Sequence, residues 1–273
     1  MSVKVAFIGA GRMAEALIKG IITAGLYSPA DIIATDVDSD RLAFMSKTYG
    51  IETSADNYGA AVSASIIVLC VKPQHLDVVL AVLGDMDMDR KLIISIAAGV
   101  TTGHIRSIIN RPVSLVRVMP NAPALVGRGI SVMAAAEELP IDDRRTASDL
   151  FSAVGEVLFL DESLINQVTA ISGSGPAYFY YWARSLERAG EAIGLPADVA
   201  ATLVRATFTG AAKLMDSSGT SLDDLITMVA SKGGTTEAAL NSFDQAAISD
   251  IITEGVESAL NRAKELDIGD KTD

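Results

Sequence analysis

The sequence predicts an α/β protein in which a doubly wound sheet at the N-terminal end is followed by an all-α domain. Short apolar strands alternate with helical patterns as far as residue 160, as is typical of parallel sheets covered by helices on both faces. From Asp161 onward the helical patterns follow one another and no strand pattern returns. Aromatic residues are few (5%) in a chain that is 49% hydrophobic, so Ala, Val, Ile and Leu must fill the core.

The N-terminal domain, expected at residues 1–161, is built from runs of apolar residues that end at Gly, Pro or polar residues. Strands are expected at 3–8, 32–36, 51–53, 64–71, 91–96, 113–118, 129–134 and 155–160. The intervening helices are expected to open at Met13, at Asp38-Ser39-Asp40, at Asp56-Asn57 and at Pro73, and then to cover 102–109 and about 141–153.

The C-terminal domain, expected at residues 162–273, is a series of helices separated by Gly, Pro and Ser. The helical patterns cover 162–171, 175–193, 196–215, 221–230, 235–243 and 247–266. The pattern at 196–215 is apolar almost all round, and such a helix must be covered on most sides. We expect a second subunit to supply part of that cover, so the chain should form a homo-oligomer.

Charge and cysteine content exclude several classes of protein. The net charge is −12 and no basic cluster is visible, which argues against nucleic acid and anionic membrane surfaces as partners. The longest apolar runs are near eight residues, too short to span a bilayer. Cys70 is the single cysteine, which excludes an internal disulfide and, with no signal-peptide pattern at the start, predicts a cytoplasmic protein.

The strongest motif is the glycine-rich turn after the first strand, where Gly9, Gly11 and Ala14 follow the pattern G-x-G-x-x-A. Gly9 lets the chain turn sharply, Gly11 lets the backbone approach a pyrophosphate, and Ala14 lets the helix lie close to the strand. The start of the helix then offers free N–H groups to phosphates. We therefore expect a Rossmann-like dinucleotide site that includes Ile8, Gly9, Ala10, Gly11, Arg12 and Met13.

Asp36 ends the second predicted strand, where an acidic residue would accept hydrogen bonds from the ribose hydroxyls of NAD and repel a 2′-phosphate. Arg12 and Arg41 are the two cations available to offset the charge of such a phosphate. Asp36 could instead be a turn or capping residue, because Asp38 and the residues after it form a good helix start.

Other candidate residues follow the strands of the predicted sheet. Ligands bind beyond the carboxyl ends of parallel strands, so turns after successive strands should meet at one edge. This edge should hold Gly9–Ala14, Asp36, Cys70–Pro73, Ala97–Gly99 and Met119–Asn121.

Two hydroxyl-rich turns are candidate substrate sites. Gly233, Gly234, Thr235 and Thr236 precede a helix, and their N–H groups should be free to bind a carboxylate. A second turn, 172–176, opens the helix predicted at 175–193. Either turn could be a plain helix cap. No metal site is expected, since His75 and His104 are the only histidines, and Cys70 should be a buried, inert thiol.

Taken together, these motifs resemble the pyrroline-5-carboxylate reductase family, and the resemblance covers nearly the whole chain. Its most specific part is Ser231-x-Gly233-Gly234-Thr235-Thr236. The other segments that carry it are Phe7–Ala14, Val71-Lys72-Pro73, Ser95–Thr101, Met119–Ala124 and Ser172–Tyr178.

The resemblance implies reduction of the cyclic imine acid 1-pyrroline-5-carboxylate to L-proline by NADPH or NADH, with an all-α C-terminal dimerisation domain that interlocks with a partner subunit. It implies that Thr236 lies near the ring nitrogen. The substrate residues it implies are Ser231, Gly233, Gly234, Thr235, Thr236, Asn121 and Ser172. Beyond the glycine-rich turn, the cofactor residues are Thr35, Asp36, Asn57, Cys70, Val71, Lys72, Pro73, Ala97 and Ala98.

Three residues depart from the family pattern. Lys232 stands where proline is usual, which predicts a less rigid loop. Arg12 stands where an amide side chain is common, which changes the contacts available to phosphates. Asp36 stands where NADP-preferring members often have a small or hydroxyl residue, so we expect both cofactors to work, with NADH at least as good as NADPH.

Three other functions compete with imine reduction. A β-hydroxyacid dehydrogenase needs a general base, commonly a lysine on the helix after a Gly-rich turn, and the helix after Gly175 has Arg184 and Arg188 but no lysine. A reductase that uses a deazaflavin would share the N-terminal pattern but would leave the helical domain unexplained. A non-catalytic NAD(P)-sensing protein that binds a partner is a further alternative, and the intact loop at Gly233–Thr236 argues against it.

Overall fold

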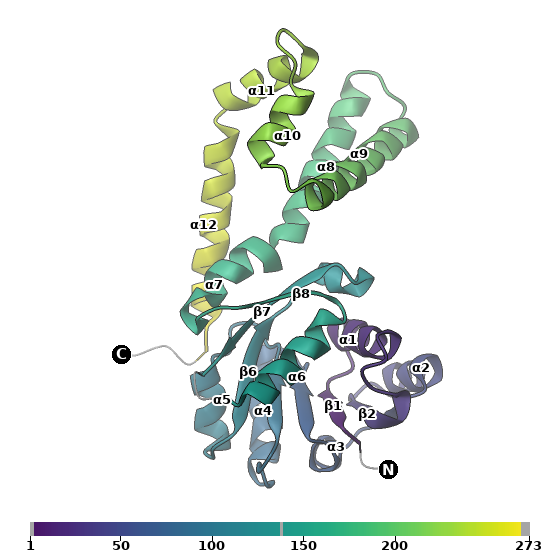
Figure 1. Cartoon of the computed structure of the whole chain (residues 1–273), viewed down its shortest axis with the longest axis vertical. Helices are drawn as coiled ribbons and strands as arrows, with labels where there is room; N and C mark the ends of the chain where they lie inside the picture. Colours follow the sequence, from purple (N-terminus) through teal and green to yellow (C-terminus); the bar gives the residue numbers. More distant parts are fainter. Residues whose placement is uncertain (1–2, 137–138, 269–273) are drawn as a thin grey trace. The chain divides into compact units, whose positions relative to one another are not determined.

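The computed structural model describes residues 3–136 and 139–268, which form two compact units (Figure 1). The first unit runs to Ser174 and takes up the chain again from Ala259. The second unit is Gly175–Ser258. The domain boundary expected after residue 161 stays a prediction.

The first unit contains one sheet, which within the described residues has eight strands in the order β3-β2-β1-β4-β5-β6-β7-β8. Strands β1 to β6 are parallel, which confirms the doubly wound fold. After β3 the chain returns to the other side of β1, and this reversal between β1 and β4 is the point where such sheets bind ligands. The strands are β1 (Val5–Ile8), β2 (Ile32–Thr35), β3 (Glu52–Ser54), β4 (Ile66–Leu69), β5 (Leu92–Ser95), β6 (Ser114–Met119), β7 (Gly129–Ala135) and β8 (Gly155–Phe159).

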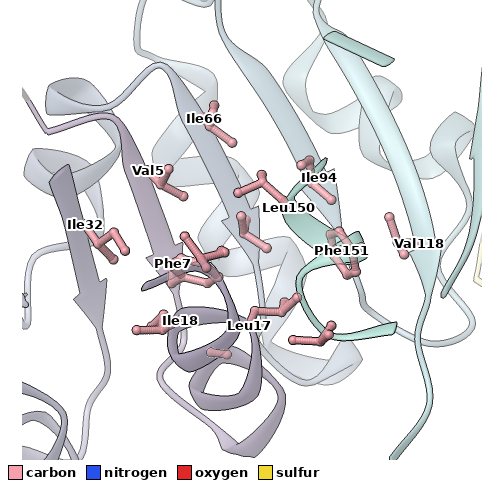
Figure 2. Close-up of a cluster of buried hydrophobic side chains, with 14 of the residues drawn as sticks. Val5, Phe7, Leu17, Ile18, Ile32, Ile66, Ile94, Val118, Leu150 and Phe151 are labelled. Atoms are coloured by element: carbon pink, nitrogen blue, oxygen red, sulfur yellow. The ribbon is translucent and has the colours of Figure 1, made fainter. Parts of the chain in front are cut away.

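Helices cover both faces of this sheet, because successive side chains along each strand point to opposite sides. Phe7 belongs to the core under one set of helices, and its neighbour Ile8 belongs to the core under the other. Figure 2 shows the first of these cores, where Leu17 of α1 and Phe151 of α6 lie over the strand residues Phe7 and Val118. The first face carries α1 (Arg12–Thr23), α2 (Ser39–Tyr49) and α6 (Ile141–Ser152), and the second carries α3 (Asn57–Ser63), α4 (Pro73–Gly84) and α5 (Thr102–Ile109).

Strand β7 runs antiparallel to β6, a reversal that the strand patterns did not indicate. The connection from Met119 to Gly129 holds only a single 3-10 turn, η2 (Ala122–Val126), so it is too short for a crossover helix. The next connection contains α6, and β8 is parallel to β7. The sheet is therefore parallel at the glycine-rich turn and mixed at its far edge.

The segment predicted as a helix at 162–171 is irregular. It consists of a 3-10 turn η3 (Glu162–Leu164), a short α7 (Ile165–Val168) and a π turn η4 (Thr169–Gly173). The hydroxyls of Thr169 and Ser172 donate to the carbonyls of Ile165 and Val168 at 2.8 and 3.0 Å, and such bonds bend helices.

The second unit is helical throughout, as the sequence predicts. Its helices are α8 (Gly175–Ala192), α9 (Ala197–Ser218), α10 (Leu222–Val229), α11 (Thr235–Gln245) and the first part of α12 (Ile248–Leu266). No helix in the described part of the chain is long and apolar enough to cross a bilayer.

Asp267 and Ile268, which directly follow α12, are held by the first unit. The N–H of Ile268 donates to the carbonyl of Gly99 at 2.6 Å. Arg117, which is 4% exposed, pairs with Glu162 at 3.1 Å and with Asp267 at 3.4 Å. Asp267 and Ile268 are therefore bonded to the first unit.

Candidate active site

The glycine-rich turn is closely packed on one side and open on the other. Gly9 has φ +97°, and a Cβ there would lie 2.9 Å from the backbone carbon and oxygen of Cys70. At Gly11 a Cβ would meet nothing within 4 Å. Because the first intrahelical bond of α1 is donated by Glu15, the N–H groups of Arg12, Met13 and Ala14 have no backbone partner among the described residues. The turn therefore provides open space and free donors, the features a pyrophosphate requires.

Asp36 faces this turn. Its Oδ2 accepts a hydrogen bond from the N–H of Ala10 at 2.9 Å, and its Oδ1 accepts one from Asp38 at 3.1 Å. The N-cap of α2 is Asp38, whose carboxylate accepts from Asp40 and Arg41. Asp36 therefore braces the turn and does not cap the helix, although it also makes a local turn bond.

The two arginines considered as partners for a phosphate, Arg41 and Arg12, differ in the contacts they already make. The Arg41 guanidinium donates to the carbonyls of Ala10 and Gly11 at 2.5 and 3.3 Å and pairs with Glu15 at 2.6 Å. Arg12 is exposed and makes no hydrogen bond or ion pair with any other residue that the structure describes. Arg41 is thus already paired, whereas Arg12 is free to meet an anion.

Asn57 is tied to the sheet through Thr35. The Thr35 hydroxyl, which is fully buried, donates to Asn57 Oδ1 at 2.6 Å. This bond leaves the amide nitrogen of Asn57 available as a donor at the start of α3.

The turns after β4 and β5 lie at the same edge of the sheet as the glycine-rich turn, because these strands are parallel. Lys72 is the exposed N-cap of α4, and Pro73 occupies its first position, where the missing N–H costs nothing. After β5, Ala97 is buried and Ala98 is exposed. Burial raises the pKa of the Cys70 thiol, which disfavours the nucleophilic thiolate.

Asn121 and Ser172 are brought together within the first unit. The Asn121 amide donates to the carbonyl of Ser172 at 3.2 Å and accepts from the N–H of Ile130 at 2.9 Å. Asn121 is only 8% exposed, so it holds the π turn against β7. The Ser172 hydroxyl donates within its own helix.

The loop before α11 lies in the second unit and differs in part from the prediction. The N–H of Gly233 donates to Glu237 Oε2 at 2.6 Å, and the N–H of Gly234 donates to the carbonyl of Ser231 at 2.9 Å. The expectation that all four N–H groups of Gly233–Thr236 are free is therefore wrong for the two glycines. Thr235 and Thr236, in the first turn of α11, keep N–H groups without a partner among the described residues. Lys232 is exposed.

The motifs alone did not reveal Glu15 and Tyr49. Tyr49 Oη donates to Glu15 Oε1 at 2.8 Å, and Glu15 in turn holds Arg41. The one available signal was the position of Glu15 four residues after Gly11, in the first turn of α1.

Among the described residues no group of three or more His, Cys, Asp and Glu is arranged to hold a metal ion. His104 pairs with Asp77 at 2.8 Å.

Comparison with known proteins agrees with this geometry in both units. A family model described as pyrroline-5-carboxylate reductase dimerisation matches residues 162–266. A second model, described as NADP oxidoreductase, coenzyme F420-dependent, matches residues 4–99.

Full-length relatives carry the same name. A pyrroline-5-carboxylate reductase of Vibrio alginolyticus is 38% identical over 97% of this chain and 97% of its own length. The solved structure of a pyrroline-5-carboxylate reductase from Coxiella burnetii is 34% identical, has a TM-score of 0.92, and is matched over 98% of this chain and 100% of its own. A Plasmodium falciparum pyrroline carboxylate reductase with NADP bound is 28% identical, with a TM-score of 0.85 over 97% of this chain and 98% of its own. The chain belongs to the pyrroline-5-carboxylate reductase family.

Proposed function

We propose that the chain reduces 1-pyrroline-5-carboxylate to L-proline at the expense of NADH or NADPH, the last step of proline biosynthesis. The observation that carries the proposal is the full-length similarity to enzymes of that name, at 38% identity over 97% of the chain. The cytoplasm is the proposed compartment, because a chain with the single cysteine Cys70 needs no oxidising environment.

The first unit fits a dinucleotide. Free N–H groups at Arg12, Met13 and Ala14 would donate to the pyrophosphate, and the absence of a Cβ at Gly11 leaves room for it. Asp36 would accept hydrogen bonds from the ribose, and the Asn57 amide, Lys72 and Ala98 would hold the rest of the nucleotide. When bound, the reduced nicotinamide supplies the hydride.

The second unit supplies the substrate loop. The free N–H groups of Thr235 and Thr236 bind the carboxylate at the positive end of α11, and the Thr236 hydroxyl pairs with the ring nitrogen. In its iminium form the ring already carries the proton, so hydride addition at the C=N carbon returns an electron pair to nitrogen and gives the neutral amine. The loop therefore needs hydrogen-bond partners and no general base. This distinguishes it from a β-hydroxyacid dehydrogenase, whose lysine is missing from α8.

Activity is tested with purified protein in two assays: NADH or NADPH with pyrroline-5-carboxylate, and NAD+ or NADP+ with a panel of hydroxy acids. Oxidation of the reduced cofactor only with the imine is the expected result. Turnover of hydroxy acids with the oxidised cofactors would favour the dehydrogenase, and binding of nucleotide without any turnover would favour the sensor.

Thr236→Ala tests the substrate loop. Losing one hydrogen bond costs about 0.5–1.5 kcal/mol, or up to about 3 kcal/mol if the partner is charged. We expect kcat/KM to fall by roughly 2- to 150-fold, with Thr236→Ser close to wild type because it keeps the hydroxyl. Full kcat/KM in Thr236→Ala would contradict the role of this hydroxyl.

The second unit should be covered by a second copy of the chain. Ala200 is the one hydrophobic residue of Gly175–Ser258 that is buried, while Phe179 and Ile251 are 64% and 60% exposed. A groove of about 480 Å³ between α8 and α9 is lined by Leu186, Ile193, Leu203 and Phe208. Large contiguous apolar surfaces are rare on monomers. Light scattering should show at least a dimer. Leu203→Glu should weaken this dimer. An active wild-type monomer at micromolar concentration would refute the proposal that a second copy covers this surface.

A further inference from the structure

The carbonyl side of the glycine-rich turn carries a linked set of three side chains, which we call the turn brace: Glu15, Arg41 and Tyr49. Arg41 Nε donates to the carbonyl of Ala10 at 2.5 Å, and Nη2 donates to that of Gly11 at 3.3 Å. The same Nη2 lies 2.6 Å from Glu15 Oε2, and Tyr49 Oη donates to Glu15 Oε1 at 2.8 Å. The guanidinium is therefore held in one orientation by three acceptors.

The turn brace is largely removed from solvent. The side chains of Arg41 and Glu15 are 23% and 24% exposed. Burial alone would raise the pKa of Glu15, but the hydrogen bonds from Arg41 and Tyr49 outweigh it, and the pKa lies below its ordinary value. Burial and the bond to Glu15 raise the pKa of Tyr49. Near neutral pH the brace therefore holds an ionised Glu15, a charged Arg41 and a neutral Tyr49.

This arrangement determines which charged side chains the ribose of a bound cofactor would meet. Asp36 accepts from the N–H of Ala10, while Arg41 donates to the carbonyl of that same residue, so the two charged groups bind the two peptide groups on either side of the Ala10 Cα. Arginine is the side chain best suited to grip a phosphate with two parallel hydrogen bonds. Here its charge is already neutralised by Glu15, and the Asp36 carboxylate is left uncompensated.

We propose that Glu15 sets the discrimination between the two cofactors by holding Arg41 on the carbonyls of the turn, away from a ribose 2′-phosphate. This inference rests on the proposed use of NADH or NADPH. Glu15 acts through Arg41 and is a positioning residue. Without its carboxylate, Arg41 can turn toward the 2′-phosphate, and one negative charge is removed from its surroundings.

The test uses two ligands that differ in the 2′-phosphate and lack a nicotinamide, adenosine 2′,5′-bisphosphate and adenosine 5′-monophosphate. Their affinities for the wild type and Glu15→Gln are measured by calorimetry, which requires no turnover. One unit charge acting on a phosphate near a screened surface corresponds to roughly three- to tenfold in affinity. We expect Glu15→Gln to bind the bisphosphate three- to tenfold more tightly and the monophosphate within twofold of wild type. The kcat/KM ratio for NADPH over NADH should rise in parallel.

Two control variants separate charge from rigidity. Tyr49→Phe removes a hydrogen bond of Glu15 but keeps both charges, so the affinity ratio of the two ligands should stay within twofold. Adding Arg41→Gln to Glu15→Gln should abolish the gain, because the gain acts through Arg41. Glu15→Met, of similar size and also uncharged, provides a second variant if Glu15→Gln fails to fold.

An unchanged ratio in Glu15→Gln, or an equal change for both ligands, would overturn the proposal and leave the turn brace a structural support only. A wild type that binds neither ligand nor either cofactor would overturn the proposed function itself, and this inference with it.

Discussion

Gly9 and Gly11 lie two residues apart, yet alanine at the two positions should fail in different ways. At Gly9 the added Cβ meets the Cys70 backbone at 2.9 Å, in a residue whose φ is +97°. At Gly11 the Cβ meets nothing within 4 Å, and φ is an ordinary −65°. Gly9→Ala should therefore damage folding, whereas Gly11→Ala should damage only the binding of the dinucleotide.

The magnitudes follow from these contacts. A positive φ costs an L-residue roughly 1–2 kcal/mol, and overpacking against backbone adds about 1–3 kcal/mol, so Gly9→Ala should lower the free energy of unfolding by about 2–5 kcal/mol. Gly25→Ala measures the cost of the positive φ alone, because Gly25 has φ +68° and open space around it. Gly11→Ala should change stability by less than about 1 kcal/mol, since a small loss at the N-cap is offset by a less flexible unfolded chain.

The assays are denaturant unfolding and calorimetric titration with NADH and NADPH. We expect Gly11→Ala to bind both cofactors at least tenfold more weakly at nearly wild-type stability, because a methyl group then occupies the space that the pyrophosphate needs. Wild-type cofactor affinity in Gly11→Ala would show that the pyrophosphate does not approach this turn. A Gly9→Ala variant no less stable than Gly25→Ala would refute the packing argument.

Three further predictions concern charged groups. Asp36→Ser should shift the kcat/KM ratio at least threefold toward NADPH, because it removes a like charge facing the 2′-phosphate; no change would mean that the carboxylate does not face the ribose. Arg117→Met should lower the free energy of unfolding by about 2–4 kcal/mol in denaturant titrations, since it leaves Glu162 and Asp267 without their buried cation; a loss below about 1 kcal/mol would contradict this. The pKa of Glu15 is lowered in the folded state, so its ionised carboxylate stabilises the folded protein. This stabilisation is fully present above the unfolded pKa of about 4.3 and is lost as pH falls through the folded pKa. The stability gap between wild type and Glu15→Gln should therefore be larger at pH 7 than at pH 3, and a constant gap would exclude this linkage.

Local patterns predicted the helices and strands well, because neighbouring residues determine where caps and turns form. The helix expected at 102–109 has those bounds, since Thr101 caps it and Asn110 ends it in a left-handed conformation. The antiparallel direction of β7 could not be predicted, because a run of apolar residues does not indicate whether the strand runs parallel or antiparallel to its neighbour. The irregular turns at 162–173 likewise arise from hydroxyl–carbonyl bonds that compete with a helical pattern.

The site residues were likewise predictable only where they lie close together in the sequence. The glycine-rich turn and Asp36 could be identified because their spacing is fixed by a single strand–helix–strand unit. Glu15, Arg41 and Tyr49 meet only in the fold, across 26 and 34 residues of sequence, and no local pattern links them. The free donors expected at Gly233 and Gly234 are absent because Glu237 reaches back past the cap residue to the N–H of Gly233, and the N–H of Gly234 donates to the carbonyl of Ser231.

The return of the chain to the first unit at Ala259 has a consequence for synthesis on the ribosome. The residues that supply the N–H to Gly99 and the second carboxylate to Arg117 are translated only after the whole of Gly175–Ser258. At about 5–20 residues per second, that delay is on the order of ten seconds. During this interval the nascent first unit carries Arg117 with Glu162 as its one carboxylate partner, so its final stability is reached late and depends on prompt completion of the helical segment.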